Sequence, residues 1–193
     1  DGFEWEERPA TAAVLARARE LSGNVTAGEG YLSEIGLAAA AWTASWAAIL
    51  GRGALLLIDY GFPRREFYHP QRNEGTLMCH YRHHAHPDPF FLPGLQDITV
   101  HVDFTAIAEA GTEAGLDFLG YTNQATFLLN CGLTDVVART PATDAARYLP
   151  LANAVHKLIS PAEMGELFKV IALGRGIDEP LVGFAAGDQS SKL

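Results

Sequence analysis

The sequence predicts an α/β domain, in which helices alternate with the strands of a sheet that is covered on both faces. A helical stretch over 36–50 leads into a continuous apolar run at 54–60, which is typical of a strand buried on both sides. A second strand is predicted over 116–121, between two helical segments, and a third over 168–173. Only a short helical region precedes this third strand. The third strand could therefore run antiparallel to the other strands of the sheet.

The composition is that of a single globular domain over 1–193. Hydrophobic residues make up 48% of the chain and charged residues 19%, which is enough apolar material for a substantial core. The longest apolar candidate, the Ala-rich stretch at 35–50, is too short to cross a bilayer. We therefore expect no membrane association.

The formal charge of −9 bears on the choice of partner. An acidic surface repels phosphate backbones, so nucleic acid is not expected as a partner, whereas a basic protein would suit it. The simpler interpretation of the negative charge is that it keeps the protein soluble and indicates no particular partner. Cys79 and Cys131 form no CxxC motif, which favours a reducing compartment.

Two polar residues are predicted to cap helices. Asp103 begins the helical segment 103–114, and Asn123 begins one that continues to Leu129. The remaining elements are a short extended segment at 31–35, helices at 10–21 and 152–159, and a loop at 140–150.

The segment 64–99 is rich in His, Pro, Asp and Arg and has no clear periodicity. A stretch of this length inside a compact domain is typical of a functional loop or a lid. We predict it to be a long inserted loop.

Short motifs follow one another in a characteristic order from Trp5 to Lys169. They are Ile58-Asp59-Tyr60-Gly61; Gly75-Thr76-Leu77 with His84, Asp88, Pro93-Gly94 and Asp97-Ile98-Thr99; His101-Val102-Asp103-Phe104; Thr122-Asn123-Gln124 with Phe127-Leu128; and Leu158-Ile159, Met164-Gly165 and Phe168-Lys169-Val170. In this order and spacing they resemble the MidA-like family of class I S-adenosylmethionine (SAM)-dependent methyltransferases, whose mitochondrial members act as complex I assembly factors.

The resemblance implies both a fold and an activity. The fold is the C-terminal half of a Rossmann-like class I methyltransferase sheet, with 64–99 as an inserted loop. The activity is methyl transfer from SAM to a protein side chain, an arginine, with a respiratory complex I subunit as a possible substrate. The location would be the cytoplasm of a bacterium or the mitochondrial matrix of a eukaryote. We interpret the final Ser191-Lys192-Leu193 as a chance match to a peroxisomal address unless the source is eukaryotic.

The chain departs from the family because neither of its two Gly-x-Gly motifs has the context of the family's glycine-rich cofactor loop. Gly28-Glu29-Gly30 is followed by only a short segment, and Gly51-Arg52-Gly53 precedes its strand. A cofactor loop instead follows a strand and opens a helix. The family carries this loop further upstream, so we expect 1–193 to be the C-terminal part of a larger methyltransferase domain, without cofactor-binding residues of its own.

Glu34, Asp59 and Tyr60 are the predicted catalytic residues. An arginine acceptor requires carboxylates that hold the guanidinium while it loses a proton. Asp59 ends a buried strand, where open α/β sheets place their ligands, although it could instead cap the following turn. Glu34 matches a glutamate of the family. Tyr60 either lines the pocket or is an ordinary half-buried aromatic.

Four further residues are predicted to bind substrate or to order the loop. His84 matches the family and would act with Asp88. Asp97 is a candidate for the same region, but a turn residue is the favoured interpretation. Gln124 lies near the start of a helix, where it could face the pocket, cap the helix or serve as a core amide.

Two other functions are consistent with the residues. One is a binding or assembly module that holds a respiratory-complex subunit without chemistry. The other is a metal-dependent hydrolase built on the cluster of His80, His83, His84, His86, Cys79 and Asp88. The spacing of that cluster fits no zinc signature, so no metal is predicted. Half of a sheet would also leave an open edge and apolar faces, from which we expect self-association.

Overall fold

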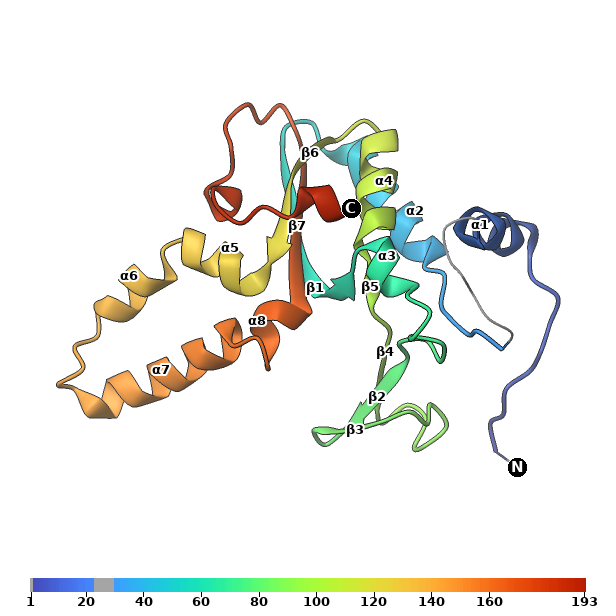
Figure 1. The fold of residues 1–193 in the computed structure, drawn as a ribbon, viewed down its shortest axis with the longest axis horizontal. Coiled ribbons are helices and arrows are strands. Elements are labelled where there is room, and N and C mark those ends of the chain that lie inside the picture. Colours follow the sequence, from blue (N-terminus) through green and yellow to red (C-terminus); the bar gives the residue numbers. More distant parts are fainter. Residues whose placement is uncertain (1, 23–29) are drawn as a thin grey trace.

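The architecture was analysed in a computed structural model, which describes residues 2–22 and 30–193. Its centre is a four-stranded sheet with the strand order β5-β1-β7-β6 (Figure 1). β7 is antiparallel to both of its neighbours, and β5 is parallel to β1. The predicted α/β fold and the antiparallel last strand are therefore confirmed. The strands are β1 (Gly53–Phe62), β5 (Val102–Asp103), β6 (Asp117–Asn123) and β7 (Phe168–Arg175).

Helices cover both faces of this sheet. On one face, α2 (Leu37–Ile49) and α4 (Phe104–Glu113) pack against β7 and β6 in the main core. On the other face, Phe127 of α5 (Gln124–Asn130) and Phe184 of a short 3-10 helix (Val182–Phe184) pack against Val170 and Ala172. The main core contains Ala47, Phe104, Ile107, Ala108, Leu116, Tyr121, Ile171 and Leu173.

The predicted burial of β1 on both faces is wrong, because the second face of the sheet remains uncovered over this strand. Leu56 and Ile58 lie directly opposite Ala172 and Val170 of β7, so they share the face of these buried residues. Yet Leu56 is 43% exposed and Ile58 is 45% exposed. Among the described residues, the other edge of β1 is paired only at Gly61 and Phe62, by β5. The sheet therefore has an open edge beside an exposed apolar strip.

The segment 64–99 is more ordered than predicted. It begins with α3 (Arg64–Phe67) and then forms a second, three-stranded antiparallel sheet with the order β3-β2-β4. Arg82 and His83 both have positive φ angles, of 49° and 66°, which a two-residue hairpin turn requires. The strands of this small sheet are β2 (Met78–Tyr81), β3 (His84–His86) and β4 (Asp97–Thr99).

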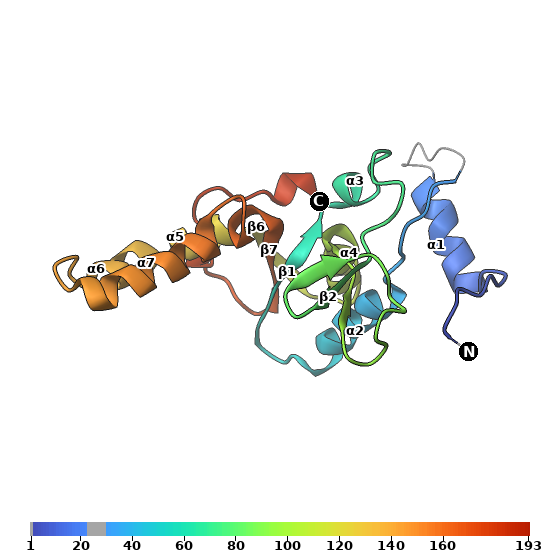
Figure 2. The ribbon, with the colours of Figure 1, turned by 90° about the horizontal axis from the view of Figure 1, so that it is seen from below.

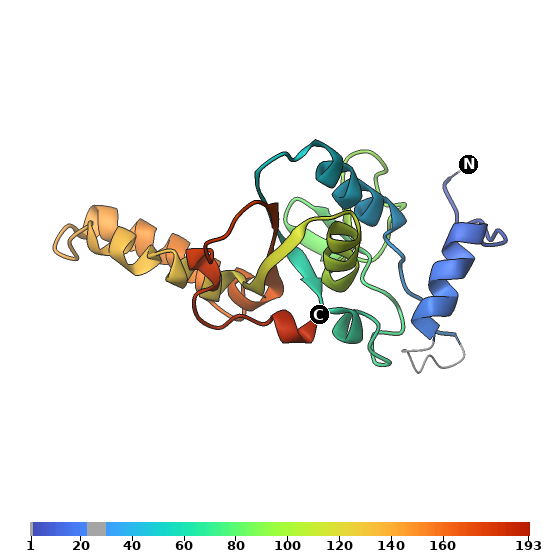
Figure 3. The same cartoon turned by 90° about the horizontal axis from the view of Figure 1, so that it is seen from above.

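The predicted loop at 140–150 is partly wrong. Asp144 caps α7 (Ala145–Ile159), which accommodates Pro150 within the helix. Neither α7 nor α6 (Leu133–Ala138) buries any side chain, and both project away from the sheet. Figures 2 and 3 show this arm at one end of the molecule and α1 (Ala12–Ser22) at the other. A last short helix, α8 (Met164–Leu167), leads into β7.

Among residues 2–22 and 30–193, no helix combines the length and the apolarity that a bilayer crossing requires.

The open edge leads to a prediction about association. We expect the 193-residue chain alone to self-associate at micromolar concentration, because unpaired strand edges next to apolar side chains bind one another. Replacing both exposed residues, Leu56→Lys with Ile58→Lys, should shift the sedimentation profile to the monomer. Val182→Lys, at a residue that is 63% exposed on another element, is the matched control and should leave the profile unchanged. A wild-type chain that sediments as a monomer would contradict the prediction.

Candidate active site

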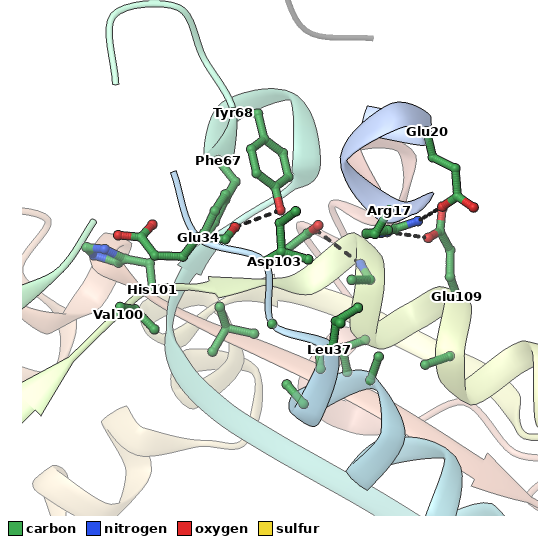
Figure 4. A pocket seen from close by; sticks show the side chains of 18 of the residues that line it. Arg17, Glu20, Glu34, Leu37, Phe67, Tyr68, Val100, His101, Asp103 and Glu109 are labelled. Atoms are coloured by element: carbon green, nitrogen blue, oxygen red, sulfur yellow. Dashed lines mark hydrogen bonds and ion pairs between the residues drawn. The ribbon is translucent and has the colours of Figure 1, made fainter. Parts of the chain in front are cut away.

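A cavity of about 530 Å³ lies beside β5, next to the carboxyl end of β1 (Figure 4). Its walls come from α1, α3, the start of α2, α4 and the segment around β5. Figure 4 shows Glu34 and His101 on one side of the cavity, and Arg17, Glu20 and Glu109 on the other. The wall is acidic, because the described residues that line it include five carboxylates and one arginine: Glu20, Glu34, Asp103, Glu109 and Glu113 with Arg17.

Glu34 anchors the inserted segment to the cavity. Its Oε1 accepts hydrogen bonds from the backbone N–H groups of Thr76 (2.8 Å) and Leu77 (3.0 Å), and its Oε2 accepts one from the Thr76 hydroxyl (3.1 Å). Gly75 allows this approach, because a Cβ there would lie 2.4 Å from Oε1. The predicted catalytic role of Glu34 stays a prediction, while the contacts of its carboxylate are those of an anchor.

Asp59 and Tyr60 lie near the cavity but are not among the described residues that line it. Asp59 is exposed, and its Oδ1 accepts a hydrogen bond of 2.8 Å from the backbone N–H of Tyr60. Tyr60 is half-buried, and its ring meets His101 and Phe168 edge-on, at centroid distances of 5.4 and 5.2 Å. The alternative interpretations as a local cap and a packed aromatic fit these contacts, and the catalytic roles stay predictions.

Arginine side chains bind the carboxylates of α4 and hold three helices together. Asp103 caps α4 as predicted, since its Oδ1 accepts the N–H of Ala106 at 3.1 Å. The Nη1 of Arg64 donates to Glu109 Oε1 at 2.6 Å, its Nη2 donates to Oε2, and its Nε lies 3.6 Å from Asp103 Oδ2. Arg17 of α1 donates to Glu109 at 3.2 Å. Burial raises the pKa of Asp103, whereas Arg64 lowers the pKa of Glu109.

His101 was missed as a candidate, although it belongs to the motif that ends in Phe104. Its ring lies next to Tyr60 and, at a centroid distance of 5.1 Å, next to Phe62. Burial lowers the pKa of His101, and so does the charge of Arg72. Its place in the motif His101-Val102-Asp103-Phe104 was the signal that the sequence offered.

The structure does not bring the predicted loop residues to the cavity. His84 is exposed on β3, and Asp97 is exposed on β4 rather than in the predicted turn. Asp88 Oδ1 accepts the N–H of Phe90 at 2.9 Å, a contact within its own turn. None of these three is among the described residues that line the cavity. Their roles in substrate binding stay predictions.

Gln124 is a buried amide of α5. Its Nε2 donates a hydrogen bond of 2.8 Å to the carbonyl of Leu158, which fits the core-amide interpretation. In the part of the chain that the structure describes, no three His, Cys, Asp or Glu side chains are grouped so that they could hold a metal ion.

The expectation that the cofactor-binding residues lie outside 1–193 stays a prediction. Among the described residues, no glycine-rich turn leads from a strand of the main sheet into a helix. Gly61 lies near the end of β1, but a Cβ there would approach Val102 O to 2.2 Å, so this glycine serves strand packing. Gly28 and Glu29 lie outside the described residues.

The Glu34 anchor can be tested in the full-length protein. Glu34→Gln replaces a charged acceptor by an amide whose NH₂ would face N–H donors, so we expect the free energy of unfolding to fall by about 2 kcal/mol. The backbone amides of Thr76 and Leu77 should exchange faster in hydrogen–deuterium exchange. Glu20→Gln, at a more exposed cavity carboxylate, should change neither measurement. Unaltered exchange at both amides of Glu34→Gln would contradict the anchoring role.

Comparisons with known proteins agree with the motifs. Residues 1–122 match the family described as "Putative S-adenosyl-L-methionine-dependent methyltransferase". The Danio rerio protein named "Protein arginine methyltransferase NDUFAF7, mitochondrial" is 29% identical over 122 residues, which are 63% of this chain and 27% of that protein.

Two crystal structures from Burkholderia thailandensis resemble the whole chain. Each is 58% identical with a TM-score of 0.94, and each match covers 100% of this chain. One is a native structure, and the other is bound to S-adenosyl-homocysteine. The chain spans only 50% and 49% of their lengths. Since the family match covers well over half of the sequence, the chain belongs to this family of S-adenosylmethionine-dependent methyltransferases.

Proposed function

We propose that the chain is the acceptor-binding part of a SAM-dependent methyltransferase that methylates a protein side chain, with arginine as the acceptor. Family membership and the relative bound to S-adenosyl-homocysteine support the activity. The name of the Danio rerio relative supports arginine. The observation that carries the proposal is the acidic cavity beside the carboxyl end of β1.

The cavity suits a cationic side chain. A volume of about 530 Å³ admits an arginine with part of its peptide, and the ring of carboxylates favours a positive charge. Phe67, Val100 and Ile107 add apolar surface on which the methylene groups can lie. Such a site holds the acceptor nitrogen in place and excludes water from it, which is the main task of a protein in an in-line methyl transfer.

The cofactor would be held by the remainder of a longer protein. In this proposal 1–193 form the C-terminal part of a larger methyltransferase domain, as the half-length match to the solved relatives suggests. The open edge of β1 is where another strand can continue the sheet. For a mitochondrial protein the proposal extends to a respiratory complex I subunit as substrate and to the matrix as the location. For a bacterial protein the location is the cytoplasm.

No specific observation favours the alternative of a non-catalytic assembly module. The metal-dependent hydrolase has no support either, because its histidines do not converge on a metal site among the described residues.

Methylation of an arginine peptide by the full-length protein tests the proposed function, and the variant Asp59→Asn tests the predicted role of Asp59 within it. If Asp59 holds the guanidinium although it is not among the cavity-lining residues, Asp59→Asn lowers kcat by about 100-fold, whereas a local cap leaves kcat unchanged. Binding of SAM, measured by calorimetry, should persist. Asp117→Asn, at the exposed start of β6, is the matched control and should keep full activity. Unchanged turnover of Asp59→Asn would remove Asp59 from the mechanism.

A further inference from the structure

We propose that His101 is the base that accepts the proton from the methyl acceptor. This assignment rests on the proposed function and adds a catalytic residue to it. His101 lines the cavity together with Glu34 and Asp103, beside the carboxyl end of β1 (Figure 4).

The backbone of His101 is fixed by the anchor described above. Its N–H donates a hydrogen bond of 3.0 Å to the Thr76 hydroxyl, and that hydroxyl donates one of 3.1 Å to Glu34. Thr76 is only 7% exposed. A proton acceptor must hold its position within a few tenths of an ångström. These two hydrogen bonds fix the backbone from which the imidazole extends.

The imidazole is held by aromatic rings. Tyr60 meets it edge-on, and Phe62 lies tilted against it at 5.1 Å, with the guanidinium of Arg72 placed 4.2 Å from the Phe62 ring. The Nδ1 atom is buried and has no hydrogen-bond partner among the described residues. Nε2 is not among these buried, unpartnered atoms, so the proposal assigns the lone pair to Nε2 and the hydrogen to Nδ1.

Burial, aided by Arg72, favours the neutral form of this imidazole. Burial is the largest influence on the pKa of His101 and lowers it, and Arg72 lowers it further, while Glu34 and Asp59 oppose them. The net direction is downward from an ordinary value of 6.5. At neutral pH the ring thus carries a free lone pair.

Two neighbouring carboxylates accept hydrogen bonds on both oxygens, and a third accepts one on a single oxygen. Glu34 accepts hydrogen bonds from the inserted segment on both oxygens, and Glu109 accepts them from Arg64 and Arg17. Asp103 Oδ1 caps α4, while its Oδ2 lies 3.6 Å from Arg64 Nε and accepts no hydrogen bond among the described residues. His101 is the uncharged group beside these carboxylates, and it is the one assigned as the proton acceptor.

The proposed step conserves atoms and charge. The acceptor nitrogen forms a bond to the methyl carbon of a sulfonium donor, and the carbon–sulfur bond breaks with its electron pair remaining on sulfur. The N–H bond of the acceptor breaks, and its proton passes to Nε2 of His101. The imidazolium then releases this proton to solvent.

The test uses the full-length protein, SAM and an arginine peptide. His101→Asn should lower kcat by about 100- to 1,000-fold, which is the usual contribution of a general base. The wild-type rate should rise with pH through an ionisation below 6.5, because the base must be neutral. This rise is the acidic limb of the pH–rate profile, and the variant should lack it. His156→Asn, at an exposed histidine of α7, is the matched control and should retain both the rate and the limb.

A second measurement does not depend on turnover. The imidazole signals of His101 in NMR spectra should titrate below 6.5, and they should shift when the arginine peptide is added without SAM. His101→Asn should retain the melting temperature of the wild type, within about 2 °C, and its affinity for S-adenosyl-homocysteine.

The outcomes separate the two proposals. A wild-type protein that binds SAM and methylates no arginine peptide overturns the proposed function, and His101 loses its role with it. An active wild type whose His101→Asn variant keeps its kcat and its acidic limb overturns only the assignment of His101. Loss of both, with cofactor binding intact and a peptide-dependent NMR shift in the wild type, supports it.

Discussion

The central constraint on this fold is β7, which is hydrogen-bonded on both sides to strands of opposite direction. Its residues Val170 to Leu173 are 0% exposed, so both of its faces are fully covered by helices and turns. β1 and β6 must then run parallel to each other, so their carboxyl ends lie at the same end of the sheet, on either side of β7. β7 pairs with β1 as far as Tyr60, and β5 pairs with Gly61 and Phe62, so the end of β1 next to the proposed acceptor site is held by both strands.

A second interaction connects the inserted segment to the cavity at this end of the sheet. Glu34 comes from the segment before α2, yet it binds Thr76 and Leu77 across 42 and 43 residues of sequence. Through Thr76 the same carboxylate fixes His101. The inserted segment is thus joined to the sheet by a few charge-assisted hydrogen bonds, which are individually stronger than neutral ones.

The sequence was informative wherever a signal was local. The long apolar runs predicted β1 and β7, and the caps at Asp103 and Asn123 were found because a capping residue and its helix are adjacent. The small inserted sheet was not predicted, because its strands have only three or four residues, too few for a periodic pattern. The start of α7 was hidden by Pro150, which the helix accommodates.

The site was harder to predict, since its contacts join distant segments. Glu34, Asp59 and Tyr60 were selected from the motifs and the predicted strand, and of the three only Glu34 is among the described residues that line the cavity. No pattern shows that both oxygens of Glu34 accept hydrogen bonds from the inserted segment. The cavity wall illustrates the consequence. In the proposed function these carboxylates provide negative charge for a cationic acceptor, while Glu34, Asp103 and Glu109 also accept hydrogen bonds from the protein itself. Attraction and proton acceptance therefore fall to different groups, and the neutral imidazole of His101 is the one suited to the second task.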